Sequence, residues 1–216
     1  MSFAEALHGL ISRFRTGVTP GARHGARIAA TSSPSGAEVA RLDALADLEL
    51  SARDVALATH WDGGSMEHAY HQWGKVVSGY VASLAEPTTR LEVLKRLLFL
   101  WWTTHLDPAE VTGISDFPAP VVVQLIDELQ VVRENATGDA ELDAMLAWYW
   151  TVFADPLRAH GINKPQDHVL PELAAMPTPF RHRGLLDCYW RDQLDCHWSA
   201  WTSGAPPAPT RGFPTA

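Results

Sequence analysis

The segment LEVLKRLLFLWWTTHLDPAEVTGISDF, residues 91–117, constrains the fold more than any other part of this chain. Leu94, Leu98 and Trp101 recur at steps of three or four residues, which predicts a helix with this face in the core. Trp102 follows at a rotation of about 100° and should face either a neighbouring helix or the polar residues after it. Truncating Trp102 is therefore expected to cost less stability than truncating Trp101.

The rest of the chain also favours helices. Apolar residues recur with a period near 3.6 in every long segment, and hairpin signals are lacking. We predict an all-α fold, a single-domain bundle of seven or eight helices. The helices with the clearest limits are expected at residues 36–47, 51–60, 65–84, 87–102, 118–135, 139–160 and 184–201. Ser51 and Asp54 are expected to form a capping box at the start of the second of these helices.

Three regions are expected along the chain. Residues 1–36 form an N-terminal amphipathic helix joined to a flexible linker rich in Gly, Pro, Ser and Thr. Residues 37–203 form the helical core domain, and residues 204–216 form an extended Pro-rich tail. The N-terminal region is interpreted as an arm that docks on the body or on a second copy, giving a homodimer. A targeting segment is the alternative, because the region is nearly free of acidic residues.

Composition limits the classes of partner. The 216 residues include nine Trp, and the net charge is −8, which disfavours nucleic-acid binding because that depends on neutralising phosphates. The acidic balance favours solubility or a basic protein partner. The two cysteines are expected to be free thiols, and no apolar run is long enough to span a membrane. These features predict a cytoplasmic protein.

A candidate metal site lies near a predicted helix start. Glu67 and His71 are four residues apart and share a helix face, and His60 precedes them. One carboxylate and two imidazoles are ligands that a divalent transition metal accepts. The competing interpretation is that these side chains are simply solvated, and the familiar catalytic motifs are missing.

Two further sets of residues are candidate binding residues. One is the polar elbow His105, Asp107 and Glu110, which follows Trp102 and could line a pocket beneath the aromatic side chains. A joint between helices, with Asp107 as the N-cap before Pro108, is the structural alternative. The other set is Trp198 and Trp201 on the last predicted helix, beside acidic residues at positions 187, 192 and 195.

The stretch LLFLWWTTHLDPAEVTGI resembles a group of uncharacterised bacterial helical proteins. In that group an aromatic-ended helix leads into a proline and then a Thr-Gly step, which here correspond to Pro108, Thr112 and Gly113. The resemblance covers residues 90–155 and implies an all-helical bacterial fold. It implies no activity, and this chain departs from the group by having Asp107 where a glutamate is expected.

These observations lead to two hypotheses on function. The first is a non-catalytic, acidic, Trp-rich binding protein without a cofactor, such as an inhibitor or immunity-type protein for a basic partner. The alternative is a metal-assisted enzyme, with a mononuclear or dinuclear site near Glu67 and His71.

Overall fold

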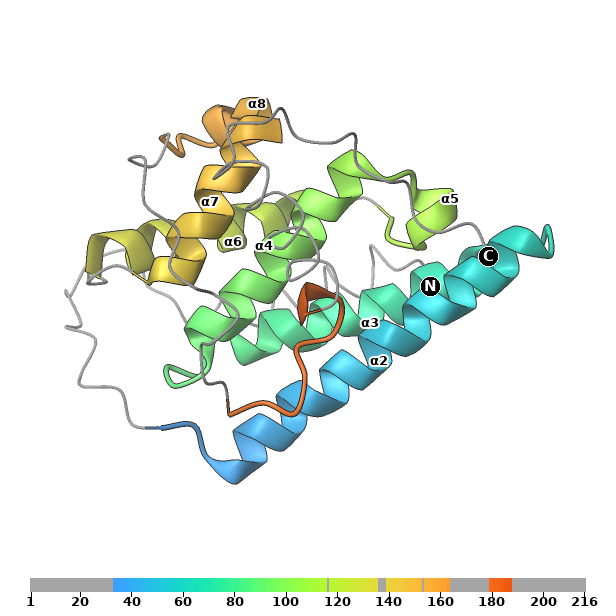
Figure 1. Cartoon of the computed structure of the whole chain (residues 1–216), viewed down its shortest axis with the longest axis horizontal. Coiled ribbons are helices and arrows are strands. Elements are labelled where there is room, and N and C mark those ends of the chain that lie inside the picture. The colour runs from blue at the N-terminus through green and yellow to red at the C-terminus, as the bar shows by residue number, and fades with distance from the viewer. Residues whose placement is uncertain (1–32, 116, 136–138, 153, 164–178, 188–216) are drawn as a thin grey trace, which may run out of the picture.

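The computed structural model describes residues 33–115, 117–135, 139–152, 154–163 and 179–187, and these ranges form a helical bundle (Figure 1). Seven helices and no strand occur in them, so the predicted all-α fold is confirmed. In chain order the helices are α2 (Gly36–Trp61), α3 (Glu67–Ser83), α4 (Arg90–Leu106), α5 (Ala109–Thr112), α6 (Ala119–Asn135), α7 (Ala140–Val152) and α8 (Ala154–Ala159). Within these ranges, no helix is both long enough and apolar enough to cross a membrane. The predicted N-terminal arm helix and Pro-rich tail lie outside the described residues.

Helix α4 is the centre of the bundle. Every residue from 93 to 103 is buried, so the helix is enclosed on all sides and not only along one stripe. It packs against α3 and α6, and α2 covers α3 and α5. The enclosed stretch includes the charged side chains of Lys95 and Arg96. A buried charge is tolerated only when it is paired, so the core needs acidic partners for both.

Helix α2 differs from the sequence prediction. Two helices were expected, the second beginning at a Ser51–Asp54 capping box, but α2 continues without a break for 26 residues. Its buried positions follow one another at steps of three or four through the expected break, namely Leu42, Ala46, Glu49, Ala52 and Ala56. No Gly or Pro interrupts the helix after its first residue, so the local capping signal is overridden by one continuous packed face.

Two predicted helix limits are confirmed and two are shifted. The Asp139 carboxylate caps α7 by accepting a hydrogen bond from the Leu142 N–H at 2.8 Å, and Gly161 follows α8 with a φ of 74°. Pro87 does not begin a helix, because α4 starts at Arg90 after a turn. Asp107 ends α4 and is not the N-cap of α5, which Pro108 precedes.

Candidate functional site

The candidate metal ligands and the polar elbow lie at the same end of the bundle. The end of α2, the start of α3 and the short helix α5 meet there (Figure 1). The Trp73 indole N–H donates to the Thr112 carbonyl over 3.0 Å. Gly113 lies so close to α2 and α3 that a Cβ there would be 2.6 Å from the Ala56 Cβ. The tertiary structure therefore joins two chain segments that no sequence pattern connects.

The candidate metal ligands at this end are exposed. Glu67 and His71 lie on the first turns of α3, and the His60 ring packs edge-on against Trp61 with centroids 5.4 Å apart. In the described ranges, no group of three His, Cys, Asp or Glu side chains is arranged to hold a metal ion. The metal-assisted hypothesis therefore gains no support from this geometry.

His105, Asp107 and Glu110, the residues of the predicted elbow, lie at different places around the joint between α4 and α5. The exposed His105 ring lies with its Nδ1 atom 3.0 Å from the Trp101 carbonyl oxygen, one turn back on α4. The Asp107 N–H donates to the Thr103 carbonyl at 3.1 Å and ends the helix. Burial raises the pKa of the Asp107 carboxyl. Glu110 lies exposed on α5.

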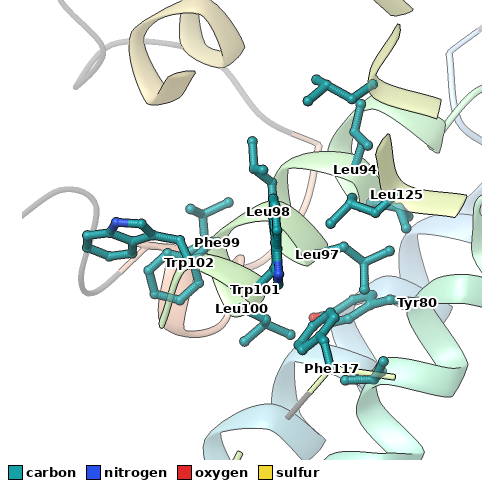
Figure 2. Packing of buried hydrophobic residues seen from close by; sticks show 14 of the residues in the cluster. Tyr80, Leu94, Leu97, Leu98, Phe99, Leu100, Trp101, Trp102, Phe117 and Leu125 are labelled. Carbon is teal, nitrogen blue, oxygen red and sulfur yellow. The ribbon is translucent and has the colours of Figure 1, made fainter. Parts of the chain in front are cut away.

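Trp102 packs against a neighbouring helix and does not lie over the elbow. Its ring stacks on Tyr149 of α7, with centroids 4.8 Å apart and planes 18° from parallel. Trp101, also buried, lies nearer the elbow, with the His105 and His160 rings packed edge-on against it at 5.7 Å. Figure 2 shows the two tryptophans among the buried residues of α4. The sequence had assigned the position next to the elbow to Trp102 as one of two alternatives.

The other predicted binding residues are not in the described ranges. Trp198 and Trp201, and the acidic residues at 192 and 195, lie beyond residue 187. Asp187 is described, and its carboxylate accepts a hydrogen bond from the Arg183 N–H at 2.8 Å.

One exposed aromatic residue was missed by the sequence analysis. Trp61, the last residue of α2, is 70% exposed, and Leu57, one turn earlier, is 36% exposed. Asp54, Leu57, Ala58 and Trp61 lie at helical steps on one exposed side of α2, which we call the Trp61 face. The available signal was the position of Trp61 directly before Asp62-Gly63-Gly64, where a helix must end and a large side chain has few neighbours.

A second candidate site is a buried charge cluster, made of Glu49, Glu92, Lys95, Arg96, Asp139, Glu141 and Arg183. At its centre, the Arg96 Nε donates to Glu92 Oε1 at 2.7 Å. The other Arg96 donors reach the Leu42 carbonyl at 3.0 Å and the Tyr80 hydroxyl at 3.4 Å. The Arg96 guanidinium also lies 5.1 Å from the centre of the Phe180 ring. Helices α2, α3 and α4 are thus joined to the 179–187 segment through one side chain.

Arg183 connects the 179–187 segment to α4 and α7. Its Nε donates to Glu92 at 2.8 Å, and its two terminal nitrogens donate to the Glu141 carboxylate at 2.5 and 3.1 Å. Lys95 completes the pairing, with its Nζ 2.9 Å from Glu141 and 2.8 Å from Asp139. Burial disfavours the charge on Glu92, but the guanidinium groups of Arg183 and Arg96 lower its pKa.

Glu49 differs from the other carboxylates of this cluster because its partners are hydrogen-bond donors without a charge. Its carboxylate accepts hydrogen bonds from the Tyr80 hydroxyl at 2.8 Å and from the Leu185 N–H at 3.0 Å. Burial raises the pKa of Glu49 to about 7, although the Tyr80 hydrogen bond and the charge of Arg96 act in the opposite direction. A buried carboxyl that titrates near neutral pH is a recognised feature of functional sites, and of structural networks too.

No known protein family, curated protein or solved structure matches this chain. The resemblance of residues 90–155 to uncharacterised bacterial helical proteins therefore stays a prediction.

Proposed function

We propose that this chain is a non-catalytic binding protein that contacts a basic protein partner through the Trp61 face. The observation that supports the proposal is Trp61 itself, which is 70% exposed at the end of a long helix. Tryptophan is enriched among the residues that dominate binding energy, because it offers a large apolar area with little conformational freedom to lose.

The surroundings of Trp61 favour a partner of positive charge. Its exposed acidic neighbours along the chain are Asp62 and Glu67, together with Asp54, which is paired with Arg53. Arg53 is the nearest lysine or arginine in sequence, and its guanidinium lies 2.7 Å from the Asp54 carboxylate. An acidic rim around an apolar anchor accelerates encounter with a basic surface and discriminates against acidic proteins. We place this binding in the cytoplasm, because the two cysteines are expected to be free thiols, which are typical of a reducing compartment.

A crosslinking experiment identifies the partner and a binding measurement tests the face. A photo-reactive amino acid at position 57 of the full-length chain should capture a basic protein in the native host. The affinity of that protein for the Trp61→Ala variant should then be lower by about 30-fold or more, as for a residue at the centre of an interface. Raising the salt concentration should slow association, because surface charges are screened.

Val123→Ala is the matched control, since Val123 is also an exposed apolar residue, 54% accessible, but lies on α6. Its affinity should stay within about twofold of the wild type, since isolated surface changes have small effects. Equal affinities for the Trp61→Ala variant and the wild type would refute this assignment of the face. Capture of an acidic protein would refute the proposed class of partner.

A further inference from the structure

Residues 179–187 cover a buried carboxyl group with backbone. The Leu185 N–H donates to Glu49 Oε1, and Gly184 lies directly over the same carboxyl. A Cβ at position 184 would be only 2.5 Å from Glu49 Oε2, so no side chain fits between the segment and the acid. Gly184 also has a φ of 63°, which favours glycine. The backbone of residues 184 and 185 therefore lies in direct contact with the Glu49 carboxyl, with no side chain between them.

The charges of the cluster balance without Glu49. The cations Lys95, Arg96 and Arg183 form salt bridges with three carboxylates, those of Glu92, Asp139 and Glu141. Glu49 is a fourth carboxyl, and in the described part of the chain it has hydrogen-bond donors but no salt bridge. It is only 1% exposed. An ionised group buried without a counter-ion of its own is unfavourable, and water would relieve the cost.

We propose that residues 179–187 form a latch that stays closed over Glu49 when this carboxyl is neutral and opens more often when it is ionised. Among the described residues around Glu49, this segment is the part that is not one of the seven helices, because Tyr80 belongs to α3 and Arg96 and Glu92 belong to α4. Opening of the segment admits water to the carboxyl and leaves those helices in place. The latch is independent of the Trp61 face, which lies at the far end of α2.

Other titratable or charged groups face Glu49 from each element packed against it. The Tyr80 hydroxyl faces Glu49 from α3. Burial and the negative charge of Glu49 raise the Tyr80 pKa well above its usual value, so this hydroxyl stays protonated. From α4 come Arg96 and Glu92, whose mutual attraction keeps both ionised near neutral pH. From the segment itself, Arg183 is held by Glu92 and Glu141.

His182 would act in the opposite direction. Its Nδ1 accepts the Gly184 N–H at 3.3 Å and its Nε2 lies 2.9 Å from Asp47 Oδ1, an arrangement that suits a ring protonated on Nε2 alone. A second proton on Nδ1 would remove the hydrogen bond from Gly184. A protonated Nδ1 would therefore hold Gly184 less tightly, whereas ionisation of Glu49 favours opening of the segment.

The sign and range of the effect follow from linkage. Glu49 titrates at about 7 when covered and near 4.5 when hydrated. Opening therefore releases a proton between these values, and the open fraction rises about tenfold per pH unit from 4.5 to 7. Above 7 both states are ionised and the dependence disappears. The ratio of the two dissociation constants limits the total change to about 300-fold.

Hydrogen exchange of the full-length protein tests the latch directly. The protection factor of the Leu185 amide, corrected for the intrinsic pH dependence of exchange, should fall by about ten- to 100-fold between pH 5 and pH 7. Protection of the Leu97 amide in the centre of α4 should change much less, because only the segment opens. In Glu49→Gln, which keeps an acceptor for Leu185 but does not titrate, the protection of Leu185 should be independent of pH.

His182→Gln is the control for the contact between the His182 ring and the Gly184 N–H, and it should keep the pH dependence of the wild type. Loss of the dependence in His182→Gln, or its persistence in Glu49→Gln, would overturn the proposal. If Glu49→Gln does not fold, carbon-13 NMR of the wild-type glutamate carboxyls decides the matter. A Glu49 midpoint near 7 supports the latch, and a midpoint near 4.5 overturns it.

Discussion

At the scale of single residues, Trp101 and Trp102 are adjacent in sequence and both buried, but they contact different parts of the molecule. Trp102 stacks on Tyr149 of α7, whereas Trp101 lies between His105 and His160. A rotation of about 100° per residue on a helix separates such neighbours. Because α4 is enclosed on all sides, both directions lead into packed surroundings and neither side chain reaches solvent.

Truncation of either tryptophan should therefore be costly. We expect Trp102→Ala and Trp101→Ala each to lower the free energy of unfolding by about 3–5 kcal/mol, since each leaves a large cavity. Trp61→Ala is the control and should change stability by no more than about 0.5 kcal/mol, because that side chain is 70% exposed. Chemical denaturation curves measure all three. A loss below about 1 kcal/mol for Trp102→Ala would show that its stacking on Tyr149 contributes little.

At the scale of helices, the short α5 depends on one glycine. Gly113 ends α5 with a φ of 70°, and its Cα faces Ala56 of α2 and Ala69 of α3. Because Gly113 has no side chain, the backbone comes close enough to both helices for the Trp73 indole N–H to donate a hydrogen bond to the Thr112 carbonyl. Glycine thus serves two purposes here, a left-handed conformation and a close contact.

A pair of glycine variants separates these purposes. Gly63→Ala, at a φ of 66° with open space around it, should lose about 1–2 kcal/mol for the left-handed backbone alone. Gly113→Ala should lose about 1–3 kcal/mol more, because its Cβ would also collide with Ala56 at 2.6 Å. Thermal or chemical unfolding gives both values. Equal losses would mean that α5 moves away from α2 at little cost.

At the scale of the whole molecule, the buried charge cluster joins elements that are distant in sequence. Arg96 contacts α2 through the Leu42 carbonyl and α3 through Tyr80, and it shares Glu92 with Arg183 of the 179–187 segment. Pairs of this kind stabilise little compared with apolar residues of the same size, but removal of one member leaves the other charge buried. The cluster therefore requires one specific arrangement of the helices.

Arg96→Met should consequently lower the free energy of unfolding by about 3–5 kcal/mol, although methionine is apolar and of similar length. The matched control is Arg181→Ala, which removes an arginine from an exposed pair with Asp47, 2.5 Å apart. That change should cost about 1 kcal/mol or less, because solvent screens surface pairs. Denaturant unfolding compares the two variants. A cost for Arg96→Met no greater than for Arg181→Ala would show that Arg183 alone suffices as the counter-ion of Glu92.

The sequence by itself determined the helical class, most helix positions and the burial of one face of the 91–102 helix. These follow from the spacing of apolar residues, which is a local property. It did not reveal that α2 is continuous, because a capping signal at Ser51 is equally local and only packing decides which signal prevails.

The pairing of the charges in the cluster and the exposure of Trp61 depend on the tertiary structure alone. Glu49 and Leu185 are 136 positions apart, and Arg183 and Glu141 are 42 apart, so no periodic pattern connects them. In the sequence Glu49, Lys95 and Arg96 resemble ordinary surface charges. Whether a charged side chain is buried and paired, or a tryptophan exposed, depends on which distant segment folds against it.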